Sequence, residues 1–211
     1  MTESGKGGVR HLLVSARREQ ILEAAIRVFA DKGFRRATTR EVAREAGVSE
    51  GTIYNYFEDK DGLLIAIMDV LNETESRAED FEEGLATDFA SFVEEYLHRR
   101  MALIWENREI FRVVLSEMLV NADLRERYMR EVVEPTMRIG EENFGSRVRE
   151  GGARATDAAL ATRVTAGAVL GLLVLGLLGD GEVASRWDEA SGVLSGLLLD
   201  GFDMAGGGRN E

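Results

Sequence analysis

The sequence predicts an all-α protein, and three observations support that class. The 211 residues include one proline and 7% aromatic residues, and the alternating β-branched runs that signal strands are few. Ala, Leu, Glu and Arg, which are frequent in helices, dominate the composition. Apolar residues recur at spacings of three and four along most of the chain. A hydrophobic content of 45% is enough for a folded core.

The first helix is expected from Ser15 onward, after a flexible, Gly-containing arm formed by residues 1–14. Gly33 stands where a glycine C-cap would end this helix. Its apolar positions share one helical face, and they are Ile21, Leu22, Ala25, Val28 and Phe29.

Two short capped helices are expected next. Thr38 and Glu41 form a capping box, in which the Thr38 hydroxyl accepts from the Glu41 amide and the Glu41 carboxylate reaches back. This helix ends at Gly47, and Ser49 can cap a second helix that runs from Glu50 to Phe57. Two short helices joined by a glycine turn predict a helix-turn-helix.

Longer amphipathic helices are expected in the rest of the chain. Asp59 can cap the first of them, and Asp157 opens a strongly apolar one. Pro135 interrupts a helical pattern, so we expect a kink or a break there. The expected helical patterns cover residues 59–71, 89–97, 111–118, 124–148, the segment after Asp157, and 183–204.

The charge of the chain is unevenly placed. Its formal net charge is −12. Residues 1–57 hold ten Lys and Arg and seven Asp and Glu, whereas the remaining residues hold 16 and 31 of the totals of 26 and 38. A chance fluctuation in a charge-rich chain would also give such a difference. On this pattern only the amino-terminal quarter can face nucleic-acid phosphate, with Lys6, Arg10 and His11 of the arm near it.

Residues 33–64 read GFRRATTREVAREAGVSEGTIYNYFEDKDGLL. A Phe follows the Gly that ends the first helix, Thr-Thr opens the second helix, Ala-Gly-Val-Ser forms the turn, Gly-Thr-Ile-Tyr-Asn-Tyr-Phe forms the third helix, and a Lys follows. With these motifs and the first helix, residues 17–64 resemble the DNA-binding domain of the TetR family of transcriptional regulators. The resemblance implies an amino-terminal three-helix DNA-binding domain and a larger helical domain for ligand binding and dimerisation.

The resemblance also implies a role for individual residues. The residues it assigns to phosphate are Thr39, Ser49, Tyr54, Tyr56 and Lys60. Those nearest the base edges are Gly51, Thr52 and Asn55, and Arg40 can reach either. Because base contacts carry sequence information and phosphate contacts do not, Thr52 and Asn55, with Arg40 behind them, are our candidates for specificity.

The composition of the third helix supports this interpretation independently. Hydroxyl and amide side chains crowd onto it, where a helix built for stability would more often use Ala, Leu, Glu or Lys. Gly51 lets backbone come close to a phosphate, which a helix amino terminus favours. We expect Val48, Ile53 and Phe57 to be core. An alternative is that the two tyrosines simply pack against the first helix.

An uncharged run of sixteen residues lies between Arg163 and Asp180. It is shorter than the roughly 20 residues of a membrane span, and no positive cluster flanks it. We therefore expect burial inside one subunit or against a partner, and no membrane.

Pairs of glycines spaced four apart lie in this run and in the last helix, and packing within one subunit explains them equally well. In TetR-like proteins the last two long helices pair with those of a second subunit, so the resemblance implies a homodimer. Two-fold symmetry then predicts a palindromic operator in double-stranded DNA, read by recognition helices about 34 to 36 Å apart. The expected interface residues are Gly167, Gly171, Leu175, Gly192 and Gly196.

The resemblance places the pocket of a small-molecule effector in the helices of residues 85–150. Aromatic and Met side chains there favour an apolar or aromatic ligand, although such a stripe is also typical of plain core. Glu117, if buried, could pair with a cationic ligand; the alternative is a solvated or Arg-paired glutamate. The candidate lining residues are Phe89, Phe92, Tyr96, Trp105, Phe111, Glu117, Met118, Met137 and Phe144.

An enzyme is not expected. The two histidines, His11 and His98, have no plausible Ser or Asp partner beside them, and the sequence lacks cysteine, a P-loop, HExxH and GxGxxG after a strand. A second alternative is a helical interaction module or an architectural DNA-binding protein without an effector. Such a protein would have a solid core between residues 85 and 150.

We therefore expect a DNA-binding transcriptional regulator, as a repressor released from its operator by a small, mainly apolar effector, with no cofactor and no metal. The absence of cysteine and of an apolar signal segment at the start predicts a cytoplasmic protein. The expected domains are a flexible arm at 1–14, the helix-turn-helix domain at 15–62, the effector-binding and dimerisation domain at 63–205, and a tail at 206–211.

Overall fold

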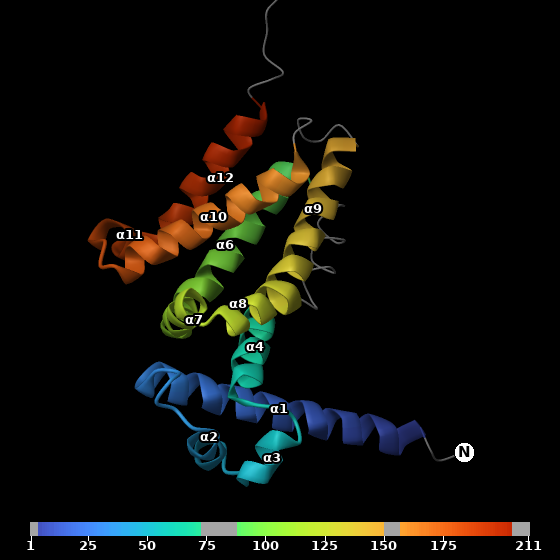
Figure 1. Cartoon of the computed structure of the whole chain (residues 1–211). Coiled ribbons are helices and arrows are strands. Elements are labelled where there is room, and N and C mark those ends of the chain that lie inside the picture. The colour runs from blue at the N-terminus through green and yellow to red at the C-terminus, as the bar shows by residue number, and fades with distance from the viewer. Residues whose placement is uncertain (1–3, 73–87, 150–156, 204–211) are drawn as a thin grey trace, which may run out of the picture. The chain divides into compact units, whose positions relative to one another are not determined.

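The computed structural model describes residues 4–72, 88–149 and 157–203. Every regular element in these ranges is a helix, which confirms the all-α class. The chain divides into two compact units (Figure 1). The head unit is Met1–Val70 with Glu109–Tyr128, and the body unit is Leu71–Arg108 with Met129–Glu211. The domain boundaries expected from the sequence stay a prediction.

The head unit is built around a long first helix. Helix α1 begins at Ser4, so the backbone that we expected to be a flexible arm is helical from that residue on. Helices α2 and α3 lie on one side of α1, and α4 leaves on the other side (Figure 1). The helices are α1 Ser4–Lys32, α2 Thr39–Glu45, α3 Glu50–Tyr54, α4 Lys60–Leu71, α7 Arg108–Val120 and α8 Ala122–Tyr128.

The core of the head unit draws on all of its helices. Burying one large aliphatic or aromatic side chain contributes about 1.5–3 kcal/mol, so this core is a main source of the stability of the head unit. The largest side chains of this unit that are less than 2% exposed are Ile21, Phe29, Ile53, Leu63, Leu64, Ile67, Met68, Ile110 and Leu124.

The body unit contains α6 Phe89–Glu106, a π-helical turn Met129–Val133, α9 Glu134–Arg149, α10 Ala158–Leu177, α11 Gly181–Ser185 and α12 Trp187–Asp203. Helix α12 packs along α6, and α10 packs along α9. The ring of Trp105 stacks on that of Trp187, with centroids 4.6 Å apart. Gly176 of α10 faces Trp105 closely, because a Cβ there would lie 2.8 Å from the indole ring.

The helix type changes just before Pro135. The π-helical turn ends at Val133, and α9 begins one residue before the proline. Pro135 has no N–H to donate, so an unbroken α-helical ladder cannot run through it. This confirms the expected kink or break. The expectation for the last helix, in contrast, is wrong. This helix does not run unbroken from Val183, because Arg186 has a non-helical backbone (φ −122°, ψ 29°) between α11 and α12.

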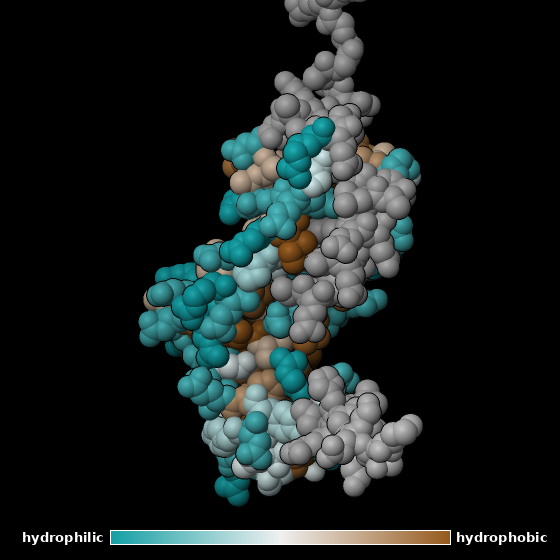
Figure 2. Space-filling view, turned by 90° about the vertical axis from the view of Figure 1, so that its right-hand side faces the viewer, coloured by the Kyte–Doolittle hydropathy of each residue, from teal (hydrophilic) through white to brown (hydrophobic). Residues whose placement is uncertain are grey.

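Helix α10 leaves much apolar surface uncovered. Among the described residues it is long and apolar enough to cross a membrane by length and composition alone, with a mean hydropathy of 1.9 and only 11% of that window buried. Among the residues that Figure 2 colours, most are hydrophilic, and hydrophobic residues lie between them. The exposed large apolar residues of α10 and α12 are Leu160, Val164, Leu170, Val174, Leu175, Val193 and Leu197. Helix α10 therefore carries more exposed apolar surface than a helix packed within one chain.

Candidate nucleic-acid interface

The helix-turn-helix is held by its caps. The Oγ1 atom of Thr38 accepts from the N–H of Glu41 at 3.2 Å, and the N–H of Thr38 donates to Oε2 of Glu41 at 3.0 Å. The Oγ atom of Ser49 accepts from the N–H of Thr52 at 3.1 Å. Between the two helices Gly47 has φ +65°, a conformation that glycine adopts without steric cost. The predicted capping box, glycine turn and Ser49 cap are confirmed.

The capping carboxylate also ties α2 to α1. Nζ of Lys32 donates to Oε1 of Glu41 at 2.6 Å. This bond, followed by the bonds from Thr38, lowers the pKa of Glu41 from 4.5 to about 2. The carboxylate therefore stays charged at neutral pH and holds the start of α2 against the end of α1.

Helix α3 has one buried and one exposed face. Ile53 is fully buried and Phe57 is 6% exposed, which confirms both as core, whereas Val48 is half-buried. Tyr54 keeps 53% of its surface exposed, so it is not a core residue. A Cβ at Gly51 would meet nothing nearer than 3.9 Å, which leaves room for close approach of another molecule. Of the polar candidates on α3 and just after it, Asn55 is exposed, and Thr52 and Tyr56 are half-buried.

A chain of hydrogen bonds links α2 to α3. Oγ1 of Thr39 lies 2.8 Å from Oε1 of Glu50 and 3.2 Å from the hydroxyl oxygen of Tyr54. A carboxylate only accepts, so the Thr39 hydroxyl donates to Glu50 and the Tyr54 hydroxyl donates to Thr39. Both hydroxyl protons that we expected to meet phosphate are thus engaged within the protein.

Glu50 is a residue that the sequence reasoning missed. It is exposed at the start of α3, between Ser49 and Gly51, both of which were predicted to contact DNA. Its negative charge could have drawn attention to it in the sequence. A carboxylate is repelled by phosphate, so one on a DNA-binding surface is expected to have a hydrogen-bond donor as its partner.

Lys60 is held by backbone carbonyls. Its Nζ donates to the carbonyl oxygen of Phe34 at 2.8 Å and to that of Ala37 at 3.0 Å, and it lies 4.4 Å from the centroid of the Phe34 ring. Two of the three ammonium donors are therefore used, and one remains for a phosphate.

Arg40 differs from Lys60, because its side chain is exposed and makes no hydrogen bond or ion pair within the described part of the chain.

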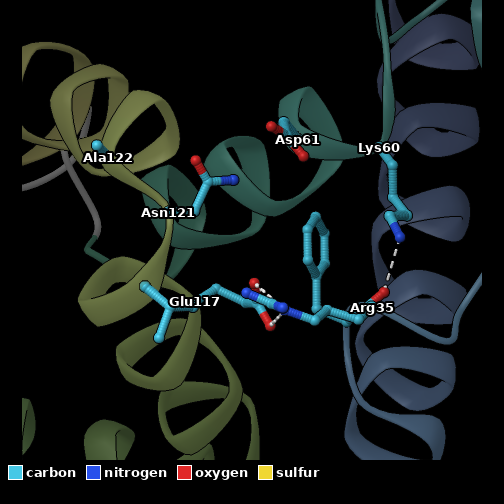
Figure 3. Close-up of a pocket in the computed structure, with 8 residues that line it drawn as sticks. Arg35, Lys60, Asp61, Glu117, Asn121 and Ala122 are labelled. Atoms are coloured by element: carbon cyan, nitrogen blue, oxygen red, sulfur yellow. Dashed lines mark hydrogen bonds and ion pairs between the residues drawn. The ribbon is translucent and has the colours of Figure 1, made fainter.

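Beside the helix-turn-helix the head unit has an open groove of about 470 Å³ (Figure 3). In it Arg35 and Glu117 point toward each other, and Nε of Arg35 lies 3.2 and 3.3 Å from the two carboxylate oxygens. Burial raises the pKa of Asp61 in the same groove, and the Asp59 carboxylate raises it further. Glu117, a candidate for pairing with a cationic ligand, is thus paired with an arginine, as in the alternative left open by the sequence.

The residues predicted to line an effector pocket fall into both units. Phe111, Glu117 and Met118 lie on α7 in the head unit, where Phe111 and Met118 are buried. The other six lie in the body unit, with Met137 half-buried on α9.

Within the body unit the aromatic candidates meet in pairs. Phe89 contacts Phe144 edge to face with ring centroids 6.2 Å apart, and Phe92 stacks on Tyr96 at 5.9 Å. Trp105 is occupied by its stack on Trp187. The pair of Phe89 and Phe144 thus joins α6 to α9. A role in ligand binding stays a prediction for each of these residues.

The residues predicted for the dimer interface lie on open surface. Gly167, Gly171 and Leu175 of α10 and Gly192 of α12 are exposed, and Gly196 is half-buried. A Cβ at any of the four glycines would meet nothing within 4 Å. Close packing within the described part of this chain therefore does not explain why these positions are glycine.

Comparison with known proteins places the amino-terminal segment in one family. Residues 21–67 match the family described as bacterial regulatory proteins, tetR family. The chain is similar to the HTH-type transcriptional regulator HbdR of Aromatoleum sp. (strain CIB), 43% identical over 74 residues, which are 35% of this chain and 32% of that protein. It is similar to the HTH-type transcriptional repressor Rv1474c of Mycobacterium tuberculosis, 44% identical over 54 residues, 26% of this chain and 29% of that protein. The matched segment thus spans about a third of these relatives.

The fold of the chain is similar to that of solved transcriptional regulators. A solved structure of the transcriptional regulator FadR from Bacillus subtilis, in complex with stearoyl-CoA, superposes with a TM-score of 0.70 at 22% sequence identity. The match covers 87% of this chain and 98% of that one. This agrees with the predicted arrangement of a helix-turn-helix domain followed by a larger helical domain.

Proposed function

We propose, from the membership of its amino-terminal domain in the tetR family of bacterial regulatory proteins, that this chain is a cytoplasmic, sequence-specific DNA-binding transcriptional regulator that acts as a repressor. One observation carries the proposal: a capped α3 sits on buried Ile53 and presents a polar, largely exposed surface. The hydroxyl and amide groups on such a surface can form hydrogen bonds with base edges and phosphates in the hydrated major groove.

Individual roles are proposed from the family resemblance. Asn55, exposed at the end of α3, would pair with a base edge, as Asn does with adenine in a bidentate way. Arg40, with its guanidinium unengaged, would reach either a base or a phosphate. Thr52 and Gly51 would lie near the bases. The residues proposed to contact phosphate are Ser49, Tyr56 and Lys60, because the hydroxyl protons of Thr39 and Tyr54 are engaged within the protein.

The proposed active form is a homodimer built through α10 and α12. The support is the apolar surface that a single chain leaves open, including Leu170, Leu175 and Val193, together with the glycines at Gly171 and Gly192, which would let a second copy come close. The same surface offers no charge for a lipid headgroup to meet along the uncharged run that follows Arg163. A two-fold dimer would place its two α3 helices on successive turns of a palindromic operator.

A small, mainly apolar effector is proposed to release the repressor. One matched relative is named a repressor, and the FadR structure holds stearoyl-CoA. In this chain Thr136 of α9 is 5% exposed, and its hydroxyl has no hydrogen-bond partner within the described residues. A buried hydroxyl without a partner is rare in folded proteins. A polar atom of a bound ligand would satisfy it, while the aromatic pairs of α6 and α9 would contact the apolar part.

Selection from a random pool of double-stranded DNA tests DNA binding. The full chain should enrich a palindrome whose half-site centres lie about 10–10.5 base pairs apart. Asn55→Ala should weaken binding to the enriched site at least tenfold with little loss on unrelated DNA, while Ser116→Ala, an exposed change on α7, should bind as the unaltered chain does. If the selected DNA molecules share no common sequence, the proposal of sequence-specific binding is wrong.

The effector has a separate test. Affinity for the enriched site is measured with and without a series of acyl-CoA thioesters and free fatty acids. A fall of at least tenfold with one chain length, absent in Thr136→Val, would support the proposed ligand class. Unchanged affinity with every member would overturn that class and leave DNA binding untouched.

A further inference from the structure

We propose that Glu50 reads a cytosine of the operator through the N4 amino group of that base, and that Thr39 is the residue that positions its carboxylate. The inference rests on the proposed function, because it requires α3 in the major groove. It goes further by naming a base and a residue that the family pattern and the sequence reasoning both left unassigned.

The geometry that supports it spans two helices. The hydroxyl of Thr39, on α2, donates to Oε1 of Glu50, on α3, at 2.8 Å. Thr39 in turn accepts from Tyr54, 3.2 Å away. The Glu50 carboxylate is therefore oriented by a donor that is itself fixed, while the side chain remains exposed. Its second oxygen, Oε2, makes no bond within the described residues and is available to a donor outside the protein.

Electrostatics then limits which part of DNA this oxygen can meet. Phosphates and the oxygen and N7 atoms of base edges are all acceptors or negative, so a fixed carboxylate is repelled by them. The donors in the major groove are the amino groups of cytosine and adenine. Adenine presents the acceptor N7 beside its amino group, which suits Asn or Gln and opposes a carboxylate. Cytosine presents its amino group without that acceptor on the same base, so cytosine is the base that Glu50 fits.

Glu50 has a simpler interpretation, in which it is only a solvated charge that favours the helix dipole at the start of α3. The two interpretations differ in what happens when the charge is removed. A solvated carboxylate near phosphate weakens binding to every sequence equally, so removing it would strengthen binding everywhere. A carboxylate that reads cytosine instead costs affinity only at one base pair in each half-site.

The experiment is selection from a random double-stranded pool with the unaltered full chain and with Glu50→Gln and Glu50→Ala. The unaltered chain should enrich cytosine at one position of each half-site, and replacement of that base should cost roughly 10- to 100-fold in affinity. Glu50→Gln should change the preference at that position to adenine, because an amide can donate and accept. Glu50→Ala should lose the preference there and keep the rest of the site.

Glu58→Gln is the matched control, because it removes one exposed negative charge from the head unit outside α3. It should enrich the same site as the unaltered chain. Thr39→Val tests the positioning role: the preference for cytosine should weaken several-fold and remain for the same base. Thr39→Ser, which keeps the hydroxyl, should restore it. All variants change exposed or half-exposed positions, and their helical content and thermal unfolding should match those of the unaltered chain.

The failures are distinguishable. If the unaltered chain enriches no sequence, the proposed function fails and the inference fails with it. If it enriches a palindrome and both Glu50 variants enrich the identical bases at every position, the inference alone is wrong. Stronger binding of Glu50→Ala to all sequences would also overturn it, since that is the result expected of simple repulsion.

Discussion

The helix-turn-helix and the last two helices of the body unit bury their apolar residues to very different degrees. Ile53 of α3 and Phe29 of α1 are fully buried within the head unit, whereas Leu170 and Leu175 of α10 keep 44% and 45% of their surface exposed. The helix-turn-helix is therefore complete within one chain, and what it offers outward is polar. The apolar surface of α10 would be buried only when another molecule covers it. The difference teaches that the two parts meet different kinds of partner.

The largest effect is expected from disrupting the surface of α10 that is proposed to contact a second copy of the chain. Leu175→Arg places a charge on the apolar surface, where burial against a second copy would strip it of water. The chain should become monomeric, as measured by sedimentation equilibrium. Operator affinity should fall by roughly 100-fold or more, because the two half-sites are no longer bound as one. Leu119→Arg is the matched control on α7, where Leu119 is 81% exposed; a dimer that survives Leu175→Arg would contradict the assigned surface.

A second change separates the buried side of α10 from its open side. Gly176→Ala would bring a Cβ to 2.8 Å from the ring of Trp105. Such overpacking should lower the free energy of unfolding by about 1–3 kcal/mol. Gly171→Ala, which meets nothing within 4 Å, should leave it unchanged or raise it, because alanine favours a helix by up to about 1 kcal/mol. Chemical unfolding of both variants at a concentration that keeps the chain monomeric measures the contrast, and equal effects would show that the two faces do not differ.

A smaller effect is expected at the ion pair in the groove of the head unit. Arg35 is 68% exposed at its side chain and Glu117 is 12% exposed. Arg35→Ala leaves a mostly buried carboxylate without its partner and should cost about 1 kcal/mol of stability, the upper range for pairs of this exposure. Glu117→Gln leaves an arginine that water can solvate, so it should cost less. A double-mutant cycle checks the asymmetry; equal costs would mean that burial of Glu117 plays no part.

The smallest expected effect concerns pH. The pKa of Glu41 is lowered to about 2 in the folded chain from an ordinary 4.5, by Lys32 first and by Thr38 next. A group with a depressed folded pKa stabilises the fold above its unfolded pKa and loses that contribution as pH falls through the folded value. The head unit should therefore lose stability between pH 4.5 and pH 2, and Glu41→Gln should reduce the slope in that window. An unchanged slope in the thermal melts would show that the capping box is not the cause.

Local signals predicted the elements of the head well. Thr38 with Glu41 marks the start of α2, and Ser49 marks the start of α3, because capping depends on residues that are neighbours in sequence. Gly47 predicts the turn for the same reason, since its positive φ is a property of one residue. The burial of Ile53 followed from its place on a short amphipathic helix.

Pairings between distant residues were not predictable in the same way. Arg35 and Glu117 are 82 positions apart, and nothing in the local pattern of either helix selects that partner. The bond from Thr39 to Glu50 crosses from α2 to α3 and depends on how the two helices pack. Lys60 illustrates the consequence, because the family resemblance implied that its charge meets phosphate, whereas two of its donors bind backbone carbonyls in the structure. Tertiary packing decides such contacts, and the sequence expresses it only indirectly.

The central claim is that the polar face of α3 binds a specific DNA sequence. The most direct test is a titration of the full chain against the enriched palindromic duplex and against a scrambled duplex of equal length and composition, at one fixed salt concentration. The account predicts at least about 1000-fold tighter binding to the palindrome. It also predicts that Asn55→Ala removes most of that ratio and leaves the affinity for the scrambled duplex in place. Equal affinity of the unaltered chain for both duplexes would contradict the claim.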